Sequence, residues 1–175
     1  EQAPLGCEGL IFLPYLTGER TPYPDPNARG VLFGLTRRTD RTYVSRAILE
    51  GVAYGLRDSF EIMEQMGLPI KEVRASGGGA RSKIWRQILA DVTGYSQSLI
   101  NVDEGPALGV ALLAGVGVGI YNSVEEACRA VIRVTQTADV CVVSRAGYKA
   151  YHKVYQSLYA HLKEDFAAVA QIGGG

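Results

Sequence analysis

Three consecutive glycines, Gly77 to Gly79, separate an apolar segment from an amphipathic one. Residues 71–76 before them predict a short buried strand, and apolar side chains recur at helical spacing from Ile84 onward. All three glycines can adopt positive φ, and none has a Cβ that would keep a ligand away from the backbone. This pattern predicts bare amides at the N-terminus of a helix, where an anion or the polar edge of a ligand is favoured.

The glycine pattern by itself leaves two interpretations open. Ser82 is expected to cap the following helix, which should run to Thr93 and stop at Gly94. The spacing matches neither the GxxxxGK[ST] pattern of a Walker A loop nor the GxGxxG pattern of a dinucleotide-binding turn. A tight turn that packs a helix closely on a sheet explains the glycines as well as a nucleotide site does.

The composition indicates a globular domain that acts on a small ligand. With 175 residues, of which 47% are hydrophobic and 21% charged, the chain is expected to build one core in a single domain. Its 18 basic residues balance 18 acidic ones, which argues against nucleic acid or a membrane as partner. Three scattered cysteines without zinc spacing, and no membrane span or signal peptide, favour a cytoplasmic location.

Strands and helices alternate along the chain, which predicts an α/β sheet covered by helices. Helices are expected at 42–66, 107–118, 123–132 and 148–170, and further strands at 10–13, 98–102 and 140–143. Residues 30–36 are expected to form a short strand or a turn. Thr42 is the predicted cap of the first of these helices. In that helix, Gly51 and Gly55 should let another backbone or a ligand pack closely. Its predicted apolar face consists of Val44, Ala47, Ile48, Val52, Leu56 and Met63.

Three further segments carry expectations. The 107–118 helix is almost wholly apolar and is expected to be central and buried on several sides. The proline-rich loop at 18–30 is either a plain surface loop or a functional one. On the last helix, His152 and His161 lie nine residues apart, which does not match the four-residue offset of a helical metal pair. Packing or solvated roles are therefore expected for both histidines.

Four stretches, taken together in their order and spacing, resemble the C-terminal part of sugar kinases of the FGGY carbohydrate kinase family. They are FLPYLTGERTPYPDPNARGVLFGLT, RAILEGVAYGLRDSFEIM, ASGGGARSKIWRQILADVTG and DEGPALGVALLAG. The likeness covers nearly the whole chain. Within the family, GERTP and GGGARSxxWRQ favour the xylulose kinases over the glycerol kinases, while related pentulose and gluconate kinases share much of the pattern.

The resemblance implies a ribonuclease H-like domain of the actin and hexokinase ATPase type, on the ATP-holding side of a cleft between two domains. It implies phosphoryl transfer from ATP to a sugar hydroxyl, D-xylulose to D-xylulose 5-phosphate, with ATP or ADP and Mg²⁺ as ligands. Residues 1–175 would form the C-terminal nucleotide-binding domain in partial form, without its first strands. The sugar would be held through an N-terminal domain outside this chain.

The same resemblance assigns the nucleotide-binding residues. Gly78, Gly79 and Ala80 match the family's adenosine and α-phosphate motif, and Lys83 falls beside a base-contacting position. Gly34, in the FGLT stretch, matches the turn near the nucleotide phosphates. The remaining candidates are Gly77, Ser82 and Arg38.

No catalytic residue and no metal ligand are assigned to this chain. The family's catalytic aspartate and main sugar-binding residues lie upstream of its first residue, so Asp25 and Asp40 are not given that role. Asp91 is expected to be a surface or capping charge. Asp103, with Glu104, is expected to set up the N-terminus of the following helix.

Three functional hypotheses follow. The first is a kinase fragment that binds adenine nucleotide but does not phosphorylate sugar alone, because it lacks the base. The second is a non-catalytic, actin-like nucleotide-binding or interaction module that acts through a partner. The third is a stable α/β domain whose glycines only pack. Because missing strands expose a sheet edge and an apolar face, we also expect a homo-oligomer, a partner chain or a rearranged edge.

Overall fold

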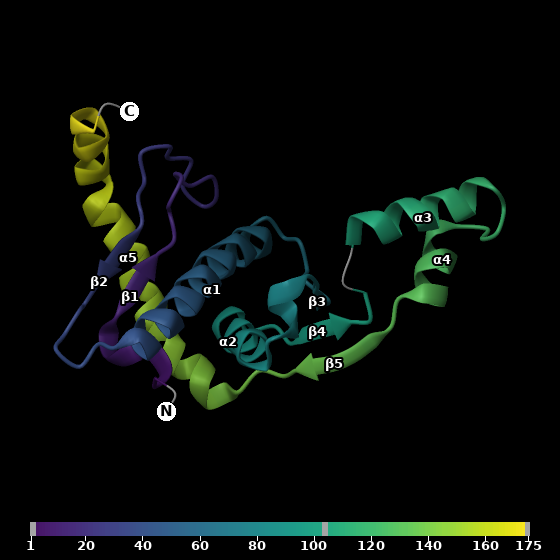
Figure 1. The fold of residues 1–175 in the computed structure, drawn as a ribbon, viewed down its shortest axis with the longest axis horizontal. Helices are drawn as coiled ribbons and strands as arrows, with labels where there is room; N and C mark the ends of the chain where they lie inside the picture. The colour runs from purple at the N-terminus through teal and green to yellow at the C-terminus, as the bar shows by residue number, and fades with distance from the viewer. Residues whose placement is uncertain (1–2, 103–104, 174–175) are drawn as a thin grey trace.

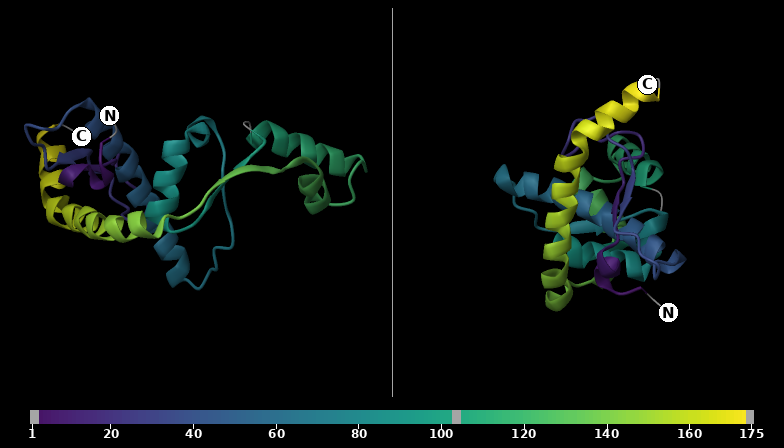
Figure 2. Two further views of the ribbon diagram at one scale, coloured as in Figure 1. Left: turned by 90° about the horizontal axis from the view of Figure 1, so that it is seen from below. Right: turned by 90° about the vertical axis from the view of Figure 1, so that its left-hand side faces the viewer.

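The computed structural model describes residues 3–102 and 105–173 and shows a body of helices and short strands with a helical arm (Figure 1). In chain order the elements are η1 (Leu5–Gly9), β1 (Ile11–Leu13), β2 (Val31–Phe33), α1 (Arg41–Gln65), β3 (Val73–Ala75), η2 (Gly78–Arg81), α2 (Lys83–Thr93), β4 (Gln97–Ile100), α3 (Gly105–Gly117), α4 (Val124–Val131), β5 (Val134–Ala138) and α5 (Val142–Ile172). The arm is the α3–α4 hairpin, which extends away from the body beyond β4 and β5 (Figure 2).

The strands of the described residues form two small sheets, whereas the alternation of strands and helices predicted one. β1 pairs with β2 in antiparallel fashion, and Ile11 lies opposite Phe33. In the second sheet β4 is central, parallel to β3 and antiparallel to β5, and Val73 lies opposite Gln97. β3 therefore delivers the chain to the glycine turn from the edge of this sheet.

The main core lies where α1, α2 and α5 pack around β1. Buried tyrosines dominate it, and the Tyr15 hydroxyl donates a hydrogen bond of 3.0 Å to the Tyr155 hydroxyl. Burial raises the pKa of Tyr155, so this ring remains an uncharged phenol. The aromatic rings supply a large buried apolar area, while the Tyr15 and Tyr155 hydroxyl groups pair with each other.

Several sequence expectations about helix ends are confirmed. Ser82 caps α2 by accepting a hydrogen bond from the Trp85 N–H, and Gly94 ends this helix with a φ of 81°. α1 differs from the expectation, because Asp40 and not Thr42 is its cap. The Asp40 carboxylate accepts the N–H groups of Thr42 and Tyr43, and the bond from Tyr43 is the main cause of its lowered pKa.

The strand predicted at 140–143 is wrong. This part of the sheet is β5, which ends at Ala138, and Val142 is already the first residue of α5. The short apolar run around residue 140 resembles a strand in isolation. Pairing with β4 instead selects the preceding residues, because Gln97 lies opposite Ala138 and Ser98 lies opposite Thr137.

The predicted apolar face of α1 is wrong in part. Ala47 is buried as expected, whereas Ile48, Val52 and Leu56 are exposed at 40%, 36% and 41%. The helix instead turns Gly51 toward β1, where this residue lies directly against the backbone of Phe12. This close approach confirms the prediction from the glycine spacing.

The expectation that the 107–118 helix is buried on several sides is also wrong. In α3 the buried residues are Leu112 and Gly115, while Val110, Leu113 and Val118 are exposed at 69%, 59% and 75%. α3 packs mainly on α4, so the arm leaves an uncharged helix surface uncovered within the described chain. No helix within residues 3–102 or 105–173 combines the length and apolar character needed to cross a membrane.

We predict that Gly51→Ala destabilises the fold much more than Gly55→Ala. A Cβ at position 51 would lie 2.2 Å from the Phe12 carbonyl oxygen, whereas a Cβ at position 55 would lie 3.3 Å from the Tyr155 hydroxyl. Gly51→Ala should lower the free energy of unfolding by about 1–3 kcal/mol through overpacking. Urea denaturation followed by circular dichroism measures both variants. Equal effects on the two free energies would contradict this packing.

Candidate functional site

The glycine turn forms a single 3-10 turn between β3 and α2. Gly77 has a φ of 84° and precedes η2, so it uses the backbone freedom expected of it. Gly78 and Gly79 do not adopt positive φ, although all three glycines were capable of it. A Cβ added at Gly78 would meet no other atom within 4 Å. The chain's own packing therefore does not explain a glycine at this position.

The turn exposes backbone donors beside a capped helix. Within the described residues, the N–H groups of Gly78 and Gly79 make no hydrogen bond, and both residues are exposed. Ser82 directs its hydroxyl oxygen to the Trp85 N–H at 3.3 Å, and Lys83 begins α2 with an exposed side chain. Unpaired amides and a cation at a helix N-terminus suit an anionic ligand.

Two clefts flank this turn. One has a volume of about 350 Å³, lies between α1, β3 and α2, and includes Gly79 and Ala80 in its wall. The other has a volume of about 430 Å³ and lies between α2 and β5, lined by Lys83, Arg86, Gln87, Gln136, Thr137 and Ala138. The turn thus contributes Gly79 and Ala80 to an apolar-walled hollow, and Lys83 at its end contributes to a polar one.

The structure brings Gly77, Gly78, Gly79, Ala80, Ser82 and Lys83 together in this turn, but it does not bring Gly34 and Arg38 to them. A Cβ at Gly34 would lie 2.3 Å from the Gly9 carbonyl oxygen, so contact within the chain explains this glycine. Arg38 forms an ion pair with Glu8 at 3.1 Å. The β2–α1 connection that carries both residues is well separated from the β3–α2 connection in two views (Figures 1 and 2).

Arg86 was not among the residues singled out from the sequence. Its guanidinium group reaches the glycine turn, where it donates a hydrogen bond to the Ala80 carbonyl oxygen. The only sequence signal was an arginine within the WRQ stretch, among apolar residues that recur at helical spacing. A helical pattern does not indicate whether such an arginine points to solvent or inward.

The expectation for Asp91 is wrong. This residue is only 4% exposed, and its carboxylate accepts hydrogen bonds from the Cys141 N–H at 2.7 Å and from the Gln87 side chain at 2.9 Å. It therefore joins α2 to the beginning of α5 and is not a surface charge. Asp103 and Glu104 lie outside the described residues.

The proline-rich loop at 18–30 is tied to α5. The Tyr159 hydroxyl donates to the Asp25 carboxylate at 3.0 Å, and the Tyr23 ring stacks on the Tyr159 ring with centroids 3.7 Å apart. The Glu19 carboxylate accepts the N–H groups of Arg20 and Thr21. These contacts give the loop a fixed shape around a hollow of about 600 Å³, away from the glycine turn.

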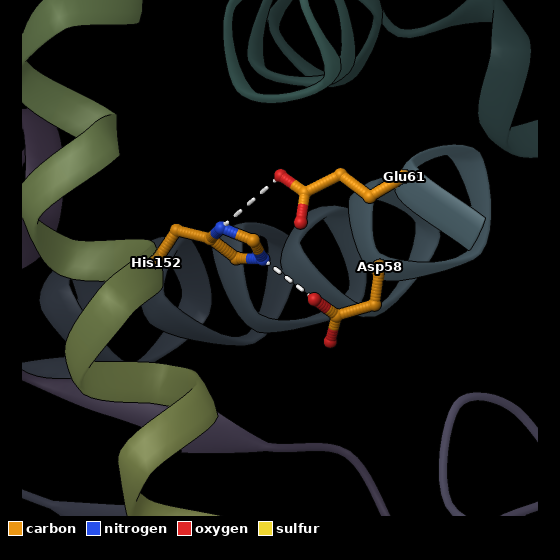
Figure 3. A group of neighbouring side chains, drawn as sticks. All are labelled: Asp58, Glu61 and His152. Carbon is orange, nitrogen blue, oxygen red and sulfur yellow. Dashed lines mark hydrogen bonds and ion pairs between the residues drawn. The ribbon is translucent and has the colours of Figure 1, made fainter. Parts of the chain in front are cut away.

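A second polar cluster joins α1 to α5. Figure 3 shows Asp58 and Glu61 of α1 facing different ring nitrogens of His152 from α5. His152 Nε2 lies 2.8 Å from Asp58 Oδ1, and Nδ1 lies 3.8 Å from Glu61 Oε1. His152 is only 2% exposed, which confirms a packing role, and His161 is exposed to solvent.

This cluster fits a hydrogen-bonded clamp better than a metal site. Its ligand atoms lie within 4.8 Å of one another. However, Arg57 pairs with Glu61 at 2.8 Å, and the Gln156 amide donates to Asp58 Oδ1 at 2.7 Å. These contacts already engage the atoms that would bind an ion. Of the buried side-chain oxygen and nitrogen atoms of this cluster, Asp58 Oδ2 alone has no partner among the described residues.

A family model for the C-terminal domain of the FGGY family of carbohydrate kinases matches residues 1–118. The chain belongs to the FGGY family. The xylulose kinase of Staphylococcus epidermidis is 34% identical over 91% of this FGGY chain and 32% of its own length, and that of Escherichia coli is 44% identical over 72% and 26%. This FGGY chain therefore spans about a third of the length of the curated relatives it matches.

Solved structures agree with this assignment. The xylulose kinase of Rhodospirillum rubrum superposes with a TM-score of 0.82 at 30% identity, over 94% of this chain and 33% of its own. The gluconate kinase of Lactobacillus acidophilus gives 0.82 at 27% identity, over 95% and 34%. A Plasmodium falciparum glycerol kinase solved with ADP gives 0.72 at 26% identity, over 86% and 30%. The FGGY chain thus has the actin and hexokinase ATPase type of fold.

We predict strong coupling between Asp58 and His152. His152→Phe should lower the free energy of unfolding by about 3 kcal/mol, because it removes one of the two side chains that pair with the buried Asp58 carboxylate. The double variant Asp58→Leu with His152→Phe should lose less than the sum of the two single losses. Urea denaturation gives the coupling free energy. His161→Phe, an exposed change on the same helix, is the control, and additive losses would contradict the clamp.

Proposed function

We propose that this chain is the ATP-holding C-terminal part of a sugar kinase and that adenine nucleotide binds at the Gly77–Lys83 turn. The observation that carries the proposal is that the amides of the exposed Gly78 and Gly79, next to the N-terminus of α2, find no hydrogen-bond acceptor among the described residues. A phosphate group can accept hydrogen bonds from such amides, and the helix dipole adds a favourable charge interaction. Lys83, the first residue of α2, adds an exposed ammonium group at the end of this turn.

Within this proposal the chain contributes binding and orientation. Gly77 permits the turn, Gly78 and Gly79 admit the phosphates, and Ser82 fixes the first turn of α2. Mg²⁺ would neutralise phosphate charge during transfer, but no residue of this chain is assigned to hold it. Gly34 and Arg38 remain predicted nucleotide contacts. Because they lie apart from the Gly77–Lys83 turn, they would contact the nucleotide only in a site that extends beyond this turn.

The sugar and the base that activates its hydroxyl belong, on this proposal, to the part of the kinase outside this chain. D-xylulose is the preferred substrate, which the GERTP and GGGARSxxWRQ stretches and the xylulose kinase relatives support. The gluconate and glycerol kinases among the solved relatives keep these sugars as alternatives. The isolated chain is accordingly expected to bind nucleotide without phosphorylating sugar.

The proposal also covers the partners of the protein and its location in the cell. The exposed apolar side chains of α3 support a contact with the remaining part of a kinase, and a homo-oligomer remains a further prediction. The balanced charge and the free cysteines Cys7, Cys128 and Cys141 support a cytoplasmic location.

Calorimetric titration with ADP and Mg²⁺ tests the nucleotide site. Gly78→Leu should weaken ADP binding about tenfold or more, since its side chain would occupy the open space over the turn where the phosphates approach. Gly109→Leu is the matched control, because a Cβ there also meets open space but lies on the arm. An unchanged dissociation constant for Gly78→Leu, or no binding by the folded chain, would contradict the proposal.

Complementation separates the kinase hypothesis from the non-catalytic module. The chain is co-expressed with the N-terminal two-thirds of the Staphylococcus epidermidis xylulose kinase, and ADP release is measured with D-xylulose, D-gluconate and glycerol. We expect activity only when both parts are present, with D-xylulose as the best substrate. A stable complex that binds nucleotide but releases no ADP with any of these sugars would favour the module. Preference for D-gluconate or glycerol would reassign the sugar.

A further inference from the structure

Within residues 3–102 and 105–173, Arg86 is a buried cation that meets no anionic partner. The residue is 3% exposed, and among the described residues it makes no ion pair with a carboxylate. One guanidinium nitrogen, Nη1, donates to the Ala80 carbonyl oxygen, and Nη2 donates to the Gln136 side-chain oxygen at 2.6 Å. Its Nε is buried and has no partner in the described part of the chain. Both acceptors are therefore neutral.

Such an arrangement costs folding free energy. A guanidinium remains charged at any pH at which proteins fold, so it cannot escape burial by losing a proton. Burying a charge without an opposite charge is unfavourable, and an apolar side chain of similar volume often gives a more stable core. Stability alone therefore does not account for an arginine at this position.

The location of the charge offers a reason. Ala80 lies within η2, between the exposed glycines and the Ser82 cap, and its own N–H donates to the Gly77 carbonyl oxygen at 3.1 Å. Ala80 is therefore held through both of its backbone groups, because its N–H donates to Gly77 and its carbonyl oxygen accepts from Arg86. The guanidinium also lines the polar cleft of about 430 Å³ that Lys83 shares. Two cations therefore line one hollow at the start of α2, where the glycine turn ends.

We propose that Arg86 is a positioning residue for the nucleotide site and that a phosphate of the bound nucleotide supplies the negative charge that the fold does not. The inference rests on the proposed function, because it takes the Gly77–Lys83 turn as the phosphate site. The hydrogen bond to Ala80 fixes η2 so that the Gly78 and Gly79 amides stay available. The buried charge adds a long-range attraction that is strongest for the most highly charged ligand, because it is poorly screened by solvent.

The test compares affinity with stability in the full 175-residue chain. Arg86→Met should weaken binding of ADP about tenfold or more, while Tm stays equal or rises, since an unpaired buried charge is removed. Binding of adenosine, which lacks phosphates, should change less than binding of ADP. Arg86→Lys keeps the charge and should recover part of the ADP affinity. Arg57→Met, which changes a partly buried arginine of α1 that pairs with Glu61 and lines neither cleft beside the turn, is the matched control and should change ADP affinity less than twofold.

Gln136→Leu provides a second variant if Arg86→Met does not fold. It removes only the second acceptor of the guanidinium on an exposed residue of β5, and it should weaken ADP binding several-fold. Wild-type ADP affinity in Arg86→Met or, where that variant is unfolded, in Gln136→Leu would overturn the inference. Parallel loss of Tm and of affinity for both ADP and adenosine would also overturn it, since that pattern is expected of a merely structural residue. Absence of ADP binding by the folded wild-type chain would instead contradict the proposed function itself.

Discussion

The close contact between α1 and β1 is the constraint on which the body depends. Because Gly51 has no side chain, the helix backbone can lie against the Phe12 carbonyl group, where even one carbon atom would overlap it. This contact sets the rotation of α1 about its axis. It directs Ala47, Ala53 and Tyr54 into the core and leaves Ile48 and Val52 partly exposed. Gly51 thus decides which face of α1 is buried, although the apolar stripe beside it is broader. Only a face without a bulky side chain can come this close to β1.

The same rotation buries two carboxylates, and each is satisfied by a different part of the chain. The Glu50 carboxylate accepts hydrogen bonds from the Gly6 N–H at 3.1 Å and the Tyr148 hydroxyl at 2.9 Å, and it pairs with Arg46 at 2.7 Å. Asp58 pairs with His152. Buried polar groups require such partners, so these bonds specify how η1 and α5 attach to α1. Burial, aided by Glu50, also raises the pKa of Cys7 to about 12, which keeps it a thiol.

The glycine turn contrasts with this compensated core. In the core, the buried carboxylates of Glu50, Asp58 and Asp91 all have hydrogen-bond partners. Among the described residues, by contrast, Arg86 meets only neutral acceptors and the amides of Gly78 and Gly79 meet none. Both features leave positive electrostatic potential at one end of α2. Unsatisfied groups are expensive to retain in a folded protein, and they concentrate where a ligand completes them. The contrast agrees with the family assignment, which came from independent comparisons.

The sequence by itself determined the local features. The glycine turn, the Ser82 cap, the Gly94 stop, the extents of most helices and the family were predictable, because each depends on neighbouring residues or on a long ordered motif. Only the tertiary structure decided which face α1 buries, that α3 is largely exposed, and that Asp91 and Arg86 point inward. It also showed Gly34 packed on Gly9, apart from the glycine turn. Periodicity states which residues share a face, but the surface that covers this face, and the partners that neutralise a buried charge, come from segments distant in sequence.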